Sequence, residues 1–146
     1  MITTLTTLAA SLLAPMPDAW VDAVEQVESS GKGASTPDGD GGRAKGPFQF
    51  WSVSWADCSS LRKKLGMSVH PYSEAKDPVI ARSYAKVWLA HLRKQLDTKL
   101  GRSPTLGETW LVWNLGMTGY GRYGYNMHKV PDAKFMKANR LNNIGR

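Results

Sequence analysis

Cysteine is almost missing from this chain of 146 residues, since Cys58 is the only one. A single cysteine excludes an internal disulfide framework, so packing of apolar side chains must hold the domain together. The sequence also has no CxxC or HxxxH pair, and His70, His91 and His128 lie far apart along it. These absences argue against a metal site, and no cofactor is expected.

Long apolar runs are missing as well. No stretch approaches the roughly 20 apolar residues that a membrane-spanning helix needs. Residues 1–14 hold an apolar run, but they lack the basic residues and the clean cleavage site of a signal peptide. Leu5, Leu8 and Leu12 instead share one helical face, which predicts a short packed helix in an N-terminal extension over residues 1–16. The length predicts one domain over residues 1–146, which we expect to be a monomer.

Acidic residues are scarce in the second part of the chain. The whole sequence has 19 basic and 12 acidic residues, a net charge of +7. Residues 1–56 hold three basic and six acidic residues, a net charge of −3, whereas residues 57–146 hold sixteen and six, a net charge of +10. Such a basic body predicts a polyanionic partner, and nucleic acid and cell wall both fit.

Start signals for helices recur along the sequence. Asp18 is expected to cap a first helix, and Asp77 with Pro78 at the first helical position predicts the longest one. Thr105 and Glu108 form a capping-box pattern. The helices are predicted over residues 18–30, 52–65, 77–100 and 105–113 and in a last short segment after Pro131. With a small glycine-rich, β-like segment at 31–46, the pattern predicts a predominantly α-helical α+β domain.

Three carboxylates lie around this glycine-rich segment. Glu28 borders an apolar stripe in the last turn of the first helix, where partial burial and the negative end of the helix dipole both raise a carboxyl pKa. A carboxyl that stays protonated near neutral pH suits a general acid. Asp38 and Asp40 follow in a loop that keeps them solvated and ionised. Two carboxyls with separated pKa values are typical of glycoside hydrolysis, although Asp-Gly pairs are also ordinary turn residues.

The strings around these carboxylates resemble the invertebrate-type lysozymes, the destabilase group of the lysozyme-like superfamily. The matching blocks are Glu28-Ser29-Ser30, Asp40 twelve residues after Glu28, Gly46-Pro47-Phe48-Gln49, Trp55-Ala56-Asp57-Cys58, and Trp113-Asn114-Leu115-Gly116-Met117-Thr118-Gly119. Several ordered blocks at near-matching spacing over residues 20–125 are specific where one alone is weak. The resemblance implies a lysozyme-like fold with a substrate cleft.

The resemblance also implies an activity, the hydrolysis of the β-1,4 bond between N-acetylmuramic acid and N-acetylglucosamine in peptidoglycan, with chitin-like oligosaccharides as further substrates. Glu28 would be the general acid and Asp40 the nucleophile or stabiliser, with retention if the carboxyls lie about 5–5.5 Å apart. Sugar-binding residues are expected at Gln49, Gly46, Asn114, Gly119, Tyr120 and Tyr123, while the tryptophans are expected mostly in the core. Such an enzyme acts on the cell wall, after secretion, in the periplasm or as a phage lysin.

Several departures keep alternatives open. The family's cysteines are missing here, apart from Cys58, and the loop after Asp40 is one residue shorter, so Asp38 stays a rival for the second carboxylate. A lytic transglycosylase that uses Glu28 alone shares several of the blocks. A non-catalytic wall-binding module is a third reading. A nucleic-acid-binding domain is disfavoured, because the basic residues are dispersed and no recognition motif is present.

Overall fold

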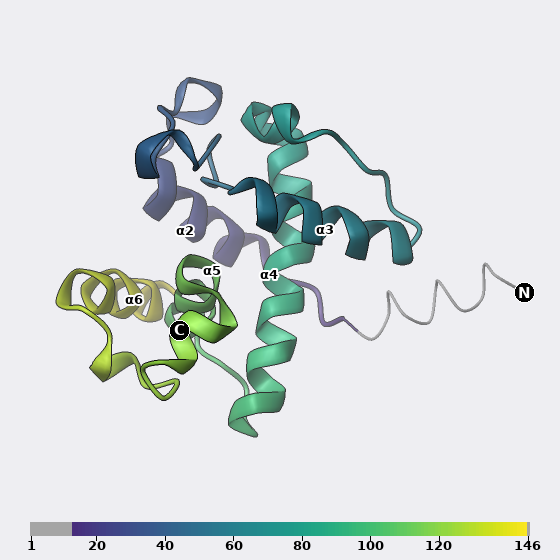
Figure 1. Cartoon of the computed structure of the whole chain (residues 1–146). Coiled ribbons are helices and arrows are strands. Elements are labelled where there is room, and N and C mark those ends of the chain that lie inside the picture. The colour runs from purple at the N-terminus through teal and green to yellow at the C-terminus, as the bar shows by residue number, and fades with distance from the viewer. Residues whose placement is uncertain (1–12, 146) are drawn as a thin grey trace, which may run out of the picture.

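The computed structural model describes residues 13–145, and within them the chain is predominantly helical. The predictions of helices over 18–30, 52–65 and 77–100, and of a last helix after Pro131, are confirmed to within one or two residues at their starts and ends. The α-helices are α2 (Asp18–Ser29), α3 (Ser52–Lys64), α4 (Pro78–Leu100), α5 (Leu106–Gly121) and α6 (Asp132–Ile144). Figure 1 shows α4 as the long helix that runs through the molecule, and α2, α3 and α5 all contact it. Helix α6 packs against α5 and α2.

Side-chain caps explain where two of these helices begin. The Asp77 carboxylate accepts hydrogen bonds from the backbone N–H groups of Val79 and Ile80, at 2.9 and 3.1 Å. The Thr105–Glu108 capping box at the start of α5 is formed in both directions. Asp18 does not cap α2, contrary to expectation; its carboxylate instead accepts a hydrogen bond from Lys86 on α4. That hydrogen bond holds the pKa of Asp18 below its usual value.

Helix α5 is longer than the sequence predicts. It was expected to end near Trp113, and it continues to Gly121 through a break at Gly116. Gly116 has φ 76° and ψ 164°, a left-handed extended conformation that only glycine adopts readily. At Gly116 the chain changes direction, and it then continues as helix to Gly121.

The glycine-rich segment between α2 and α3 contains short turns of 3₁₀-helix, η1 (Gly33–Ser35) and η2 (Asp40–Gly42). Two isolated antiparallel bridges, Gly39 with Ala44 and Lys45 with Phe50, are the only β pairing among residues 13–145. The loop is anchored at Gly46, where a Cβ atom would lie 1.8 Å from the carbonyl oxygen of Ala75. The described chain is therefore helical with a tightly fixed loop.

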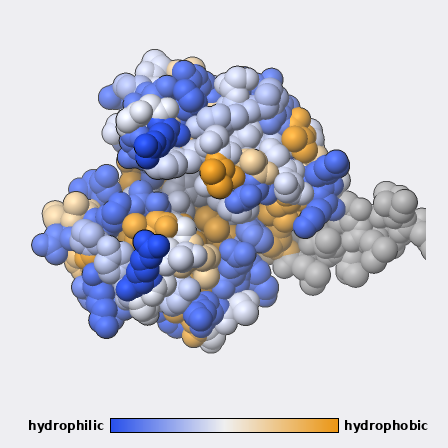
Figure 2. Space-filling view, in the orientation of Figure 1, coloured by the Kyte–Doolittle hydropathy of each residue, from blue (hydrophilic) through white to orange (hydrophobic). Residues whose placement is uncertain are grey.

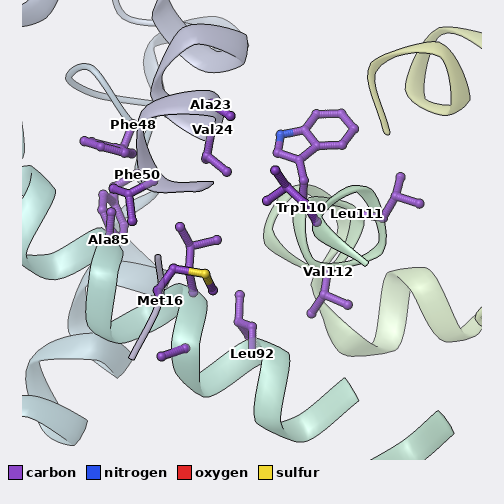
Figure 3. Close-up of a cluster of buried hydrophobic side chains, with 14 of the residues drawn as sticks. Met16, Ala23, Val24, Phe48, Phe50, Ala85, Leu92, Trp110, Leu111 and Val112 are labelled. Atoms are coloured by element: carbon purple, nitrogen blue, oxygen red, sulfur yellow. The ribbon is translucent and has the colours of Figure 1, made fainter. Parts of the chain in front are cut away.

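Aromatic side chains dominate the core. Trp55 of α3 stacks on Tyr84 of α4 with ring centroids 3.7 Å apart, and Phe50 meets both rings edge-on. The indole of Trp55 also donates to the carbonyl oxygen of His70 at 2.9 Å. In Figure 3, Phe48 and Phe50 lie on one side of the cluster and Trp110 of α5 on the other, with Val24 of α2 between them. Such packing holds the described chain together, since its single cysteine, Cys58, is free.

The N-terminal extension lies largely outside the described residues, and so does its predicted helix. Met16, which is described, is buried in the core. None of the helices formed by residues 13–145 has the length and hydrophobicity that crossing a membrane requires.

Candidate functional site

A pocket of about 360 Å³ brings together four residues that the sequence predicts for the site, Glu28, Asp40, Gln49 and Asn114. They come from the end of α2, from η2, from the loop before α3 and from α5. The pocket is completed by Arg43, Trp51, Trp113 and Lys134. It is therefore formed by the glycine-rich loop on one side and by α5 and α6 on the other.

Glu28 is partly buried in the last turn of α2. Its Oε1 atom accepts a hydrogen bond of 2.8 Å from the indole N–H of Trp110. Figure 3 shows this indole nitrogen on the edge of the ring that faces Val24 and α2. The pKa of Glu28 is raised to about 6: burial is the largest cause and Asp40 adds to the rise, while the Trp110 hydrogen bond and nearby lysines oppose it. The predicted rise in the pKa of Glu28 is confirmed, and burial is its main cause.

Asp40 and its rival Asp38 lie in different surroundings. Asp40 lines the pocket, has a left-handed backbone with φ 50°, and accepts a hydrogen bond of 3.1 Å from the indole of Trp51. Asp38 is exposed and pairs with Lys45 at 2.9 Å and with Lys76 at 3.5 Å. The Lys45 hydrogen bond lowers the pKa of Asp38. Of the two, Asp40 is the carboxylate that faces the same pocket as Glu28.

Gln49 both lines the pocket and braces the loop. Its side-chain amide donates to the carbonyl oxygens of Gly46, at 3.0 Å, and Pro37, at 3.3 Å, and its backbone is left-handed with φ 54°. These bonds fix the orientation of the Gln49 amide group within the loop. Asn114 is exposed on α5, and its carbonyl oxygen accepts a hydrogen bond from the Lys134 amino group.

Four predicted sugar-binding residues do not line this pocket. The prediction for Tyr120 is wrong: its ring is fully buried in the core, and burial raises the pKa of its hydroxyl to about 12. The prediction for Gly46 is also wrong, because Gly46 is buried against the backbone of Ala75. Gly119 lies beyond the break in α5, and Tyr123 packs against the core.

Two tryptophans belong to the site, although the sequence places these residues in the core. Trp51 is 40% exposed at the start of α3, and Trp113 is half-buried next to Asn114. Trp51 immediately precedes α3 and lines the pocket, so it departs from the expectation that the tryptophans lie mostly in the core. Their adjacency to Gln49 and Asn114 along the chain was the signal that could have identified them.

A second, larger groove of about 550 Å³ continues from the pocket and shares Trp51, Trp113 and Asn114 with it. Its further walls are mainly apolar and come from α3, α4 and the region around the break in α5, including Val53, Trp88, Leu92, Leu115 and Met117. Figure 2 shows that hydrophobic side chains reach this face of the molecule between hydrophilic ones. Pocket and groove adjoin each other, because they share these three lining residues.

The comparisons with known proteins add nothing to this description, since no family model, curated protein or solved structure matches the chain. Among residues 13–145, no three His, Cys, Asp or Glu side chains gather in a way that could hold a metal ion. The pocket therefore offers one carboxyl group with a raised pKa, a second carboxyl group and two cationic side chains.

Proposed function

We propose that this protein is a peptidoglycan-degrading glycoside hydrolase of lysozyme type, built on a lysozyme-like α+β fold, which cleaves the β-1,4 bond after N-acetylmuramic acid. The observation that carries the proposal is Glu28: a partly buried carboxyl whose pKa is raised to about 6, in the same pocket as the second carboxylate Asp40. Two carboxyls in unlike environments are what acid-assisted glycoside hydrolysis requires. The site of action is the cell wall.

In the proposed reaction, Glu28 gives its proton to the glycosidic oxygen as the bond to the anomeric carbon breaks. Asp40 attacks that carbon or stabilises its developing positive charge, and the Trp51 indole keeps the Asp40 carboxylate oriented. A water molecule then attacks the anomeric carbon and loses its proton to Glu28, which returns the acid to its starting state. The Trp110 hydrogen bond positions the Glu28 carboxyl throughout.

The tryptophans and amides account for binding of a glycan chain. The flat rings of Trp51 and Trp113 offer apolar faces to the C–H side of a pyranose ring, the role that the buried Tyr120 cannot fill. Gln49 and Asn114 supply hydrogen-bonding groups at the pocket. The groove beyond them leaves room for further sugars on one side of the cleavage point.

The test compares cell-wall hydrolysis by the wild type with that by Glu28→Gln, Asp40→Asn and Asp38→Asn. We expect Glu28→Gln and Asp40→Asn to lose at least about a hundredfold in rate, the usual contribution of a general acid. Asp38→Asn is the matched control, because its carboxylate serves two surface ion pairs. Full activity of Glu28→Gln would contradict the proposal.

The products separate the two classes of wall-degrading enzyme. Hydrolysis leaves reducing muramic acid ends, whereas a lytic transglycosylase, which needs only Glu28, leaves 1,6-anhydromuramic ends. We expect reducing ends, because Asp40 shares the pocket with Glu28. Anhydro ends, together with full activity of Asp40→Asn, would assign the transglycosylase reaction instead.

A further inference from the structure

The pocket contains cations that its acids do not neutralise. Arg43 and Lys134 both line it, and neither forms an ion pair within the part of the chain that the structure describes. Lys45 on the same loop and Lys76 at the end of η3 (Tyr72–Lys76) behave differently, since both pair with Asp38. Arg43 and Lys134 are thus two cationic groups free to bind a ligand.

Proton donation by Glu28 does not explain these cations. Lys134 lowers the pKa of Glu28, which opposes the protonated form that a general acid needs. When Glu28 is protonated, the pocket lining carries one carboxylate, that of Asp40, and two cations. The form of the site that can donate a proton therefore has a net positive lining, which favours an anionic ligand.

We propose that Arg43 and Lys134 bind carboxylates carried by the glycan and make the enzyme selective for anionic over neutral strands. The inference rests on the proposed function and names its substrate class. Arginine matches a carboxylate with two parallel hydrogen bonds, and lysine adds a mobile point charge. The Arg43 guanidinium lies 5.7 Å from the centre of the Trp51 ring, so a sugar on that ring would bring its acidic substituent close to it.

Lys134 approaches from the other wall. It lies on α6, whereas Arg43 follows η2 in the glycine-rich loop, so the two cations come from separate parts of the fold. The Lys134 amino group donates to Asn114 and keeps further donors for a ligand. An acidic substituent on either side of the cleaved bond can then meet a cation. Neutral chitin-like strands lack this substituent, so they gain nothing from either residue.

The experiment measures a preference, the ratio of kcat/KM on native cell walls to kcat/KM on the same walls with their carboxyl groups converted to amides. We expect the wild type to prefer native walls by about tenfold, as for one charge-assisted hydrogen bond. Arg43→Gln and Lys134→Gln should each reduce this ratio, and the double variant should bring it near one. Arg140→Gln on α6 and Lys64→Gln on α3, both exposed and outside the pocket, remove the same charges and should leave the ratio unchanged.

The ratio separates recognition from acid strength. A change in the pKa of Glu28 alters cleavage of both walls alike, so it does not move the ratio. Wild-type ratios in the Arg43 and Lys134 variants would overturn the inference while leaving the hydrolase intact. Glycan strands without their peptides keep only the lactyl carboxylate of muramic acid. If the preference for the native form remains on such strands, the recognised group is the lactyl carboxylate. If the preference is lost, the recognised carboxylates are those of the peptide stem.

A binding measurement keeps the inference testable if the proposed hydrolysis fails. The amount of Glu28→Gln that binds to native walls is divided by the amount that binds to amidated walls, which measures the preference without any cleavage. Adding Arg43→Gln and Lys134→Gln to that variant should abolish the preference for native walls. Equal binding of Glu28→Gln to both walls would refute carboxylate recognition. If the wild type binds native walls preferentially but does not cleave them, only the proposed hydrolase activity is refuted.

Discussion

The hydrogen bond from Trp110 to Glu28 gives a quantitative prediction for Trp110→Phe, which removes the indole N–H and keeps an aromatic ring. A hydrogen bond to a charged group is worth about 1.5–3 kcal/mol, and about 1.4 kcal/mol corresponds to one pH unit of pKa. The lost bond favoured the ionised carboxylate, so its loss raises the pKa of Glu28 from about 6 to about 7–8. Because Glu28 is only partly buried and water can replace some of the bond, we expect a value near 7.

The measurement is the pH dependence of kcat/KM on a soluble glycan, which reports the pKa values of the free enzyme. The acid must be protonated to act, so activity falls above its pKa, and in Trp110→Phe this alkaline limb should move up by about one pH unit. Trp55→Phe is the matched control: it also removes a buried indole donor, but that indole bonds to His70 away from the pocket. An alkaline limb that stays near pH 6 in Trp110→Phe, or that moves equally in Trp55→Phe, would refute the reasoning.

Three further predictions concern stability and reactivity. Because the pKa of Glu28 is raised from 4.5 to about 6 on folding, ionising this group costs the folded state about 2 kcal/mol once the pH exceeds 6 and nothing below about pH 4.5. Glu28→Gln should therefore be more stable than the wild type by about 2 kcal/mol in urea unfolding at pH 8, and equally stable at pH 4. An equal gain at both pH values would contradict this. Gly46→Ala, whose Cβ would meet the Ala75 backbone, should cost about 3 kcal/mol or more, against about 1 kcal/mol for Gly124→Ala, which has a similar φ but open space. Burial raises the pKa of Cys58 to about 12, so a thiol reagent should modify it in urea and leave it unmodified in the native protein; rapid native labelling would show that the thiol is accessible.

The elements that the sequence predicted best are those whose signals are local. The Asp77 cap and the Thr105–Glu108 box depend on groups within three residues of each other, so their patterns could be read directly. Asp18 has the same pattern of residue types, but a lysine on another helix competes for its carboxylate. The break at Gly116 was missed, because a glycine within an apolar run is compatible with a helix end as well as with a change of direction.

Site residues followed a similar rule. The burial of Glu28 was predictable from its position at the edge of an apolar stripe, and the position of Asp40 in the same pocket agrees with its expected pairing with Glu28. Arg43 and Lys134 could not be predicted as pocket residues, because their approach to one pocket depends on how α6 packs beside the loop. Tyr120 was expected in the site and lies in the core, whereas Trp113 was expected in the core and lines the pocket. Both lie on α5, and only packing decides which ring is covered.

The bond between Trp110 and Glu28 joins positions 82 residues apart, and this has a consequence for when the proposed enzyme acquires its chemistry. In an unfolded chain Glu28 is surrounded by water and keeps the ordinary pKa of 4.5, so at neutral pH a much smaller fraction of it carries a proton than in the folded protein. The second half of the chain must be made and docked before the carboxyl is shielded. We therefore expect a chain that ends before Trp110 to lack both this hydrogen bond and the full rise in the pKa of Glu28.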